Sequence, residues 1–285
     1  MAGSTLVQDL IEAGIHFGQR SSGWNPKMGP FIYGKRNGIH IIDIKETVKG
    51  LLLAKRFLAR IVSEGKDVCF VGTKRQARSV LEQRVGDVKM HYVTERWLGG
   101  TLTNFRTIRS RLKRLEELEG LEQGQAMASY SKKMESQLRR ERNKISRNLS
   151  GIRAMDKLPG ALVVIDVRRE INALREARKL GIPTICLIDT DGDPELADIP
   201  VPGNDDSMRS IDVVIRELCL AIAEGRQLRS GKPLEEALPG VPGADGAQQP
   251  RRSRRAQFRS DEPGAGPEEP GVPVGAEPAG AAKQV

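Results

Sequence analysis

Two hydrophobic periods alternate along the first 230 residues of the chain. Continuous runs of Val, Ile, Leu, Cys and Phe predict buried strands, with shorter strands beside them, over 68–71, 90–93, 161–165, 184–188 and 199–201. Apolar residues at helical spacing predict helices between these strands, over 5–13, 46–62, 72–84, 170–180 and 207–223. Strands that alternate with helices of this length form βαβ units. The pattern therefore predicts a doubly wound, mostly parallel α/β sheet, with the proline-containing strand at an edge.

Turn residues indicate where several of these elements begin and end. Gly181 and Gly225 follow helical patterns, and we expect the helices to end there. The Asn37-Gly38 pair separates two short extended pieces, 31–33 and 39–44, and predicts a tight hairpin turn. Residues 14–28 are rich in glycine, aromatic and cationic residues, and we expect a loop there.

Residues 105–149 depart from the alternation. Each of two segments there has only a narrow apolar seam, with steps of three, four or seven residues. The seams consist of Phe105, Ile108, Leu112 and Leu115, and then of Met134, Leu138, Ile145, Leu149 and Ile152. A turn-like break at 120–125 separates them. We expect an inserted, projecting coiled-coil hairpin; the alternative is two helices packed flat on the sheet.

Composition and charge divide the chain further. Of the 47 residues from 239 to 285, 24 are Gly, Pro or Ala, which predicts a disordered tail. The charges of that tail cancel, so the formal net charge of +9 belongs to the rest of the chain. Residues 105–149 hold 12 Lys plus Arg and 6 Glu. We therefore expect an α/β domain (1–104 and 150–230), a basic hairpin (105–149) and a disordered tail (231–285).

Several classes of protein are not expected from this sequence. No apolar run approaches the roughly 18 residues of a membrane span, and the N-terminus does not resemble a secretory signal. Three sparse cysteines fit a reducing cytoplasm rather than a disulfide scaffold. Neither a G-x-G-x-x-G fingerprint nor a P-loop occurs, so no nucleotide cofactor is predicted. The Gly72-Thr73-Lys74 helix start could bind an RNA phosphate or be a plain helix start.

The residues that could bind a metal or act as nucleophiles lack the spacing that such sites require. Asp189-Thr190-Asp191-Gly192-Asp193 resembles the start of a Ca²⁺-binding loop. In that loop, however, Pro194 stands where Gly is needed and Pro200 stands where Glu is needed. We interpret it as a polar turn; a Mg²⁺-dependent site that includes Asp166 is the alternative. The histidines and cysteines lack zinc-ligand spacing, and Cys69, Cys186 and Cys219 are expected in the core. No metal site and no catalytic residue is predicted.

Clustered cations predict where a polyanion would bind. Around Trp24, Phe31 and Tyr33 the chain interleaves aromatic and cationic residues; these would stack on bases, or else pin the loop to the core. Adding the helix start and the hairpin gives the predicted RNA-binding residues: Arg20, Lys27, Lys35, Arg36, Lys74, Arg75, Arg96, Arg106, Arg109, Arg111, Lys113, Arg114, Lys132, Lys133, Arg139, Arg140 and Lys144.

Five motifs occur in a characteristic order: Trp24-Asn25-Pro26-Lys27-Met28, Arg36–Asp43 (RNGIHIID), Phe70–Lys74 (FVGTK), Arg96–Phe105 (RWLGGTLTNF) and Ile199–Asp206 (IPVPGNDD). Together they resemble the bacterial-type S-two family of small ribosomal subunit proteins, over about four-fifths of the chain. Gln19 stands where that family commonly has a second histidine, and the tail after 231 matches nothing in it.

The resemblance implies a flavodoxin-like domain with an inserted coiled-coil hairpin, without enzymatic activity, cofactor, membrane or small-molecule substrate. It implies a ribosomal, cytoplasmic protein that contacts 16S ribosomal RNA. It further implies that the protein helps to dock neighbouring ribosomal proteins, including the large messenger-binding ribosomal protein one. One alternative is a nucleotide- or phosphosugar-processing enzyme that uses Lys74, Asp166 and Asp189. Another is a pure protein-docking module.

Overall fold

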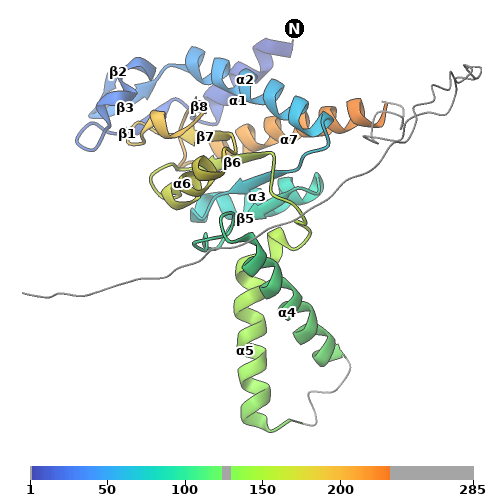
Figure 1. Cartoon of the computed structure of the whole chain (residues 1–285). Coiled ribbons are helices and arrows are strands. Elements are labelled where there is room, and N and C mark those ends of the chain that lie inside the picture. Colours follow the sequence, from blue (N-terminus) through green and yellow to red (C-terminus); the bar gives the residue numbers. More distant parts are fainter. Residues whose placement is uncertain (1, 124–129, 232–285) are drawn as a thin grey trace, which may run out of the picture. The chain divides into compact units, whose positions relative to one another are not determined.

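The computed structural model describes residues 2–123 and 130–231 of the chain (Figure 1). Its centre is a parallel sheet of β4 (Val68–Val71), β5 (His91–Val93), β6 (Ala161–Ile165), β7 (Thr184–Ile188) and β8 (Ile199–Pro202). The strand order is β5-β4-β6-β7-β8, which is the doubly wound order of flavodoxin-type sheets. The predicted parallel α/β sheet is thus confirmed, and the proline-containing strand β8 lies at an edge. The expected tail lies outside the described residues.

Alternate residues of the buried strands enter two different cores. Phe70 packs on one face with apolar side chains of α2 (Ile44–Ser63), α3 (Arg75–Asp87) and α7 (Met208–Ser230). Val71 packs on the other face with α6 (Ile171–Leu180) and with the loops that lead to the inserted helices. Burial on both faces explains why these strands are continuous apolar runs rather than alternating ones. The cysteines are buried thiols, as expected.

The residues expected to form a loop after α1 (Ala2–Glu12) contain regular structure instead. β1 (Phe17–Arg20) pairs with β3 (Ile39–Ile42), which also pairs with β2 (Ile32–Arg36), in a small antiparallel sheet. A 3₁₀ helix spans Pro26–Phe31. The strand β1 was missed because it is short and depends on a partner that is distant in sequence. The predicted Asn37-Gly38 turn is confirmed, since both residues have positive φ, at 50° and 77°.

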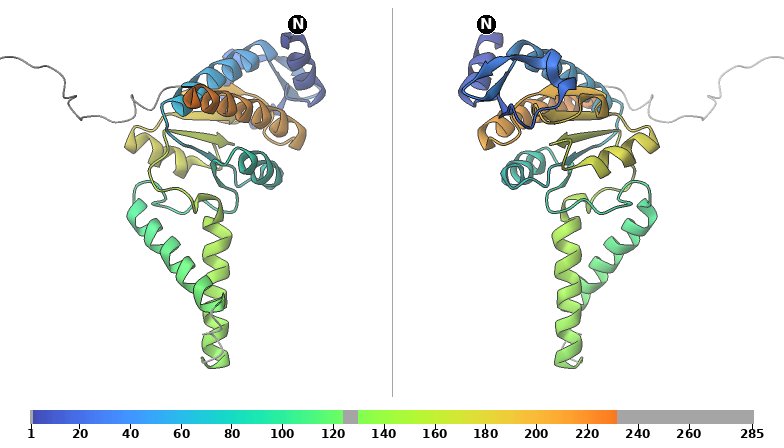
Figure 2. Two further views of the ribbon diagram at one scale, coloured as in Figure 1. Left: turned by 90° about the vertical axis from the view of Figure 1, so that its right-hand side faces the viewer. Right: turned by 90° about the vertical axis from the view of Figure 1, so that its left-hand side faces the viewer.

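The inserted stretch forms α4 (Phe105–Gln123) and α5 (Lys132–Leu149). Figure 2 shows both helices leaving the sheet at one end. Ile108 and Leu112 of α4 still pack in the core beneath the sheet, whereas Leu118 and Leu138 form a small cluster between the helices. The break expected at 120–125 begins later, because α4 continues through Gly120 to Gln123. Among the described residues, no helix is both long and apolar enough to cross a membrane.

Two predicted helix ends are also wrong. The final helix begins next to the expected residue, since Ser207 is the N-cap of α7, but the helix passes through Gly225 and ends at Ser230. A Cβ at Gly225 would lie 2.6 Å from the carbonyl oxygen of Ala59 on α2, so this glycine permits close helix packing rather than a helix end. The basic helix α3 begins at Arg75, three residues after Gly72, because β4 is followed by a short extended turn at Lys74.

Candidate nucleic-acid interface

The carboxyl ends of the parallel strands carry a cluster of charged side chains. Lys74 follows β4, and its Nζ lies 2.6 Å from a carboxylate oxygen of Asp205 and 2.6 Å from one of Asp206. Asp166, which follows β6, lies 3.5 Å from the same nitrogen. The cluster occupies the switch point between β4 and β6, where doubly wound proteins commonly bind ligands. Here the Lys74 ammonium is already neutralised by the protein's own carboxylates.

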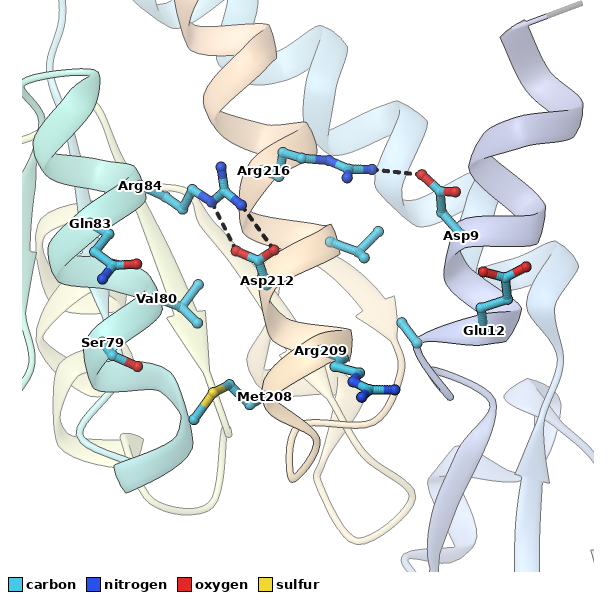
Figure 3. Close-up of a pocket in the computed structure, with 12 residues that line it drawn as sticks. Asp9, Glu12, Ser79, Val80, Gln83, Arg84, Met208, Arg209, Asp212 and Arg216 are labelled. Carbon is cyan, nitrogen blue, oxygen red and sulfur yellow. Dashed lines mark hydrogen bonds and ion pairs between the residues drawn. The ribbon is translucent and has the colours of Figure 1, made fainter.

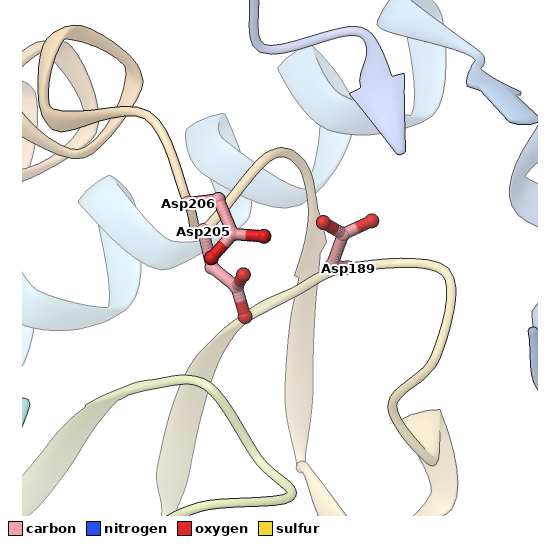
Figure 4. Close-up of side chains that lie close together, drawn as sticks. All are labelled: Asp189, Asp205 and Asp206. Carbon is pink, nitrogen blue, oxygen red and sulfur yellow. The ribbon is translucent and has the colours of Figure 1, made fainter. Parts of the chain in front are cut away.

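Three of the carboxylates lie close together (Figure 4). The side chains of Asp189, Asp205 and Asp206 each offer an oxygen, all within 4.8 Å of one another. Gln19 donates hydrogen bonds from its side-chain amide to Asp189, at 3.2 Å, and to Asp206. The donors to these oxygens include the Lys74 ammonium, the Gln19 amide and the backbone N–H of Thr190, which donates to Asp189 at 2.6 Å. The polar turn expected at 189–193 is thus part of a larger cluster of internal ion pairs.

The electrostatics of this cluster follow from one ammonium shared by several carboxylates. Burial and the charge of Asp166 raise the pKa of Asp205 to about 8, although Lys74 opposes this shift. Burial also raises the pKa of Asp189 to about 6. For Lys74, burial alone would lower the pKa, but the charge and hydrogen bonds of the aspartates raise it overall. Lys74 therefore keeps its proton and acts as the internal counter-ion of the cluster.

The joint between the sheet and α4 is organised by a buried glutamate that the sequence analysis missed. Glu176 of α6 accepts hydrogen bonds from the Trp97 indole (3.0 Å) and from the backbone of Gly100 (2.8 Å), Leu102 (3.0 Å) and Thr103 (3.1 Å). Burial opposes ionisation of this carboxyl, but these donors lower its pKa overall. The helical spacing could have indicated that Glu176 is buried, because it lies three residues after the core residue Ala173 and faces the same side of the helix.

Five of the predicted RNA-binding cations are engaged by carboxylates. Besides Lys74, the bonded pairs are Lys27 with Asp193 and Glu195, Arg109 with Asp156, Arg114 with Glu117 and Glu141, and Arg139 with Glu135. Arg142 and Arg147, which the prediction left out, are also paired, with Glu122 and Glu95. These carboxylates offset part of the positive charge that the paired cations would otherwise offer to an external polyanion.

The other twelve predicted cations are exposed and lack a carboxylate partner within residues 2–123 and 130–231. Seven lie on the inserted helices: Arg106, Arg111 and Lys113 on α4, and Lys132, Lys133, Arg140 and Lys144 on α5. The remaining five are Arg20, Lys35, Arg36, Arg75 and Arg96. Exposed cations without a carboxylate partner in the described part of the chain are available to bind phosphates.

The hairpin β2–β3 carries an exposed aromatic group beside two of these cations. Tyr33 is 81% exposed and lies on the same strand as Lys35 and Arg36. Trp24 is less exposed and lies against the ring of His40, with the ring centroids 5.0 Å apart. Tyr33 is thus available for stacking on a base, whereas Trp24 has a packing contact inside the protein.

A groove of about 720 Å³ lies over α7, between α1 and α3 (Figure 3). Two ion pairs lie within the groove: Arg84 donates to both carboxylate oxygens of Asp212, and Arg216 donates to Asp9. Because cations and carboxylates alternate along its walls, the groove does not present the single sign of charge that a phosphate backbone requires.

The fold and surface define a doubly wound α/β protein with an inserted pair of cationic helices. Residues 10–225 of the chain match the family model of ribosomal protein S2. The small ribosomal subunit protein uS2 of Rhodopirellula baltica is 53% identical over 239 residues, 84% of this chain and 90% of the relative. The chain belongs to the ribosomal protein S2 family, which confirms the resemblance seen in its motifs.

Two further relatives also align with most of this chain and with most of their own length. The small ribosomal subunit protein uS2c of Mesostigma viride is 45% identical over 79% of this chain and 99% of its own length. The protein uS2 of Rippkaea orientalis is 46% identical over 81% of this chain and 87% of its own length. The aligned lengths show that the resemblance spans nearly the whole length of these relatives.

Proposed function

We propose that this protein is a structural constituent of the small ribosomal subunit and binds 16S ribosomal RNA through electrostatic contacts. The observation that carries the proposal, beyond family membership, is the set of twelve exposed cations that have no carboxylate partner within 2–123 and 130–231. Lysine and arginine side chains that replace the counterions of a phosphate backbone gain affinity from the release of those counterions. A rigid surface also loses little entropy on binding, and Glu176 holds the joint before α4 in place.

In this proposal the α/β domain and the inserted helices have different roles. The α/β domain, residues 1–104 and 150–230, positions the inserted helices, and residues 105–149 form a coiled-coil hairpin that presents most of the cations. The strand order supports a flavodoxin-like description of the domain. The same protein would help to dock neighbouring ribosomal proteins, including the large messenger-binding ribosomal protein one, on a cytoplasmic ribosome.

The enzyme alternative is disfavoured by the state of its proposed residues. Lys74 would have to bind a substrate phosphate, but it is mostly buried and held by Asp205 and Asp206. The matched family and the relatives give no support to a nucleotide- or phosphosugar-processing activity. We therefore propose a role without catalysis and without a cofactor.

The test compares two triple variants that remove the same charge from the same helices. Replacing Arg106, Lys113 and Arg140 by Ala removes cations that have no partner in the described part of the chain. We expect weaker binding of full-length protein to 16S ribosomal RNA. The slope of log affinity against log salt should fall by roughly two to three, at about one per phosphate contact. Fluorescence anisotropy at several salt concentrations measures both quantities.

The matched control replaces Arg109, Arg114 and Arg139, each of which already pairs with a carboxylate. Its RNA affinity and salt slope should change much less, because these charges are already compensated within the protein. Equal losses in both variants would show that internal pairing does not decide which cations bind RNA. An unchanged slope in both would place the RNA surface elsewhere.

A further inference from the structure

A small cleft lies where α4 and α5 approach the loop that joins them to the sheet. Its volume is about 310 Å³, at the lower end of the range for ligand pockets. The lining consists of Leu98, Arg111, Glu141, Lys144, Ile145, Asn148 and Leu149. Leu98 precedes Gly100 in the loop that Glu176 anchors, so one wall of the cleft is fixed to the core. This wall of the cleft is thus held in place by the protein itself.

The cations of the cleft match a phosphate group. Arg111 and Lys144 are exposed, and neither has a carboxylate partner within the described ranges of the chain. The one acidic side chain that lines the cleft, Glu141, lies 3.5 Å from Arg114. Arg111 and Lys144 come from different helices, so the two charges approach an occupant from two sides. Unpaired cations beside an apolar interior favour a ligand that carries both a phosphate and a flat apolar face.

The interior of the cleft combines apolar surface with hydrogen-bond acceptors. Leu98, Ile145 and Leu149 supply aliphatic surface. The amide nitrogen of Asn148 donates to the carbonyl of Lys144 in its own helix, which leaves the amide oxygen as an acceptor. Together with the Glu141 carboxylate, this oxygen favours an occupant that offers N–H donors. Adenine, cytosine and guanine offer such donors through their exocyclic amino groups.

We propose that this cleft holds one unstacked nucleotide of the ribosomal RNA, with an amino-bearing base between the helices and its phosphate at Arg111 and Lys144. This inference rests on the proposed RNA-binding function and adds a defined contact to it. Sequence-specific recognition of RNA generally uses bases that have left the helical stack. The cleft thus adds a base-specific contact to a surface that otherwise binds phosphates without regard to sequence.

The test fills the cleft without removing a charge. Asn148→Trp places a large side chain in the cleft, and Asn143→Trp makes the same substitution at an exposed position of α5 outside it. We expect Asn148→Trp to lower the affinity for 16S ribosomal RNA about tenfold, which is the size of one lost base contact. The salt slope should stay near that of the wild type, since every cation remains. Asn143→Trp should bind as the wild type does.

Chemical probing of the bases supplies the second measurement. Wild-type protein and Asn143→Trp should protect one single-stranded A, C or G that Asn148→Trp leaves reactive. If circular dichroism shows that Asn148→Trp does not fold, Asn148→Leu is the substitute, since it also fills space and removes the acceptor. The proposal is overturned if a folded cleft variant gives the wild-type affinity and footprint. It is also overturned if RNA binding is intact and only the assembly of a neighbouring protein is lost.

These outcomes separate this inference from the proposed function. Failure of the wild-type protein and of Asn143→Trp to bind RNA in a salt-dependent manner would contradict the electrostatic RNA-binding function itself. Salt-dependent binding by all variants, without a nucleotide that depends on Asn148, would contradict only the assignment of the cleft.

Discussion

At the scale of single residues, buried charge is placed where it holds segments together. Lys74 joins the end of β4 to Asp205, which follows the distant strand β8, and Glu176 gathers the backbone of the loop before α4. Removing one side chain from such a group leaves its buried partners without hydrogen bonds, which is destabilising. Lys74, Asp166 and Asp189, the residues of the enzyme alternative, here contact other side chains of the protein.

The raised pKa of Asp205 leads to a dependence of stability on pH. The folded protein retains a proton on Asp205 up to about pH 8, whereas the unfolded chain releases it near the ordinary value of 3.8. The folded state binds more protons across this window, so the contribution of Asp205 to stability falls as the pH rises through it. Asp205→Asn has no titrating carboxyl at this position, so it does not lose stability in this way. The melting temperature of the variant minus that of the wild type should therefore increase as the pH rises through this window.

Asp206 provides the matched control for this experiment. Burial raises its pKa, but hydrogen bonds from Lys74 and Gln19 lower it overall, so it stays ionised throughout the same window. Asp206→Asn should therefore keep a constant difference in melting temperature from the wild type at pH values above its ordinary pKa. Thermal unfolding followed by circular dichroism would measure both variants, and parallel curves for the two would contradict the assignment of the proton to Asp205.

At the scale of elements, the two long helices on one face of the sheet depend on close backbone approach. A Cβ at Gly225 of α7 would lie 2.6 Å from the Ala59 carbonyl oxygen and 3.1 Å from the Ala59 Cα. Both of these are backbone atoms, which cannot move aside as the end of a side chain can. Glycine destabilises the interior of a helix relative to alanine. At this position of α7, however, it allows the backbone of α2 to pack directly against the helix.

Gly225→Ala tests this packing. We expect it to destabilise the protein by about 1–3 kcal/mol, because the added methyl forces the two helices apart. Gly86→Ala in α3 is the control, since a Cβ there would meet nothing within 4 Å. That change should be neutral or stabilise the protein by up to about 1 kcal/mol, because alanine favours a helix over glycine. Equal effects of the two substitutions in chemical denaturation would contradict the packing argument.

At the scale of the whole molecule, charge is distributed in two different ways. The Lys74 cluster is mostly buried, whereas the cations of α4 and α5 are exposed to solvent. Salt screens exposed charges strongly and buried pairs much less, and exposed ion pairs such as Arg139 with Glu135 contribute little to stability. Stability and RNA binding should therefore respond differently to ionic strength.

The expected result is that salt separates the two properties. Between about 0.1 M and 1 M salt, where the screening length falls from roughly 10 Å to 3 Å, RNA affinity should fall by orders of magnitude. The melting temperature of the free protein should change by only a few degrees over the same range. A large loss of melting temperature with salt would show that the surface pairs of α4 and α5 support the fold.

The sequence by itself determined the layers of this protein. The continuous runs at 68–71, 161–165 and 184–188 have the predicted bounds in the structure, because a strand buried on both faces needs apolar residues at every position. The Asn37-Gly38 turn was also predictable, since both residues tolerate positive φ. The motifs that identify the family, and the concentration of cations in 105–149, are likewise visible in the chain alone.

Only the tertiary structure decided which charges are free. Lys74 and Arg106 are both cations in a basic sequence, yet Lys74 meets Asp205, 131 residues away, while Arg106 has no partner within the described ranges. The strand β1 and the length of α7 were missed for the same reason, since each depends on a distant backbone contact. Local sequence reports propensity and charge, whereas pairing and close approach arise only when the fold brings distant segments together.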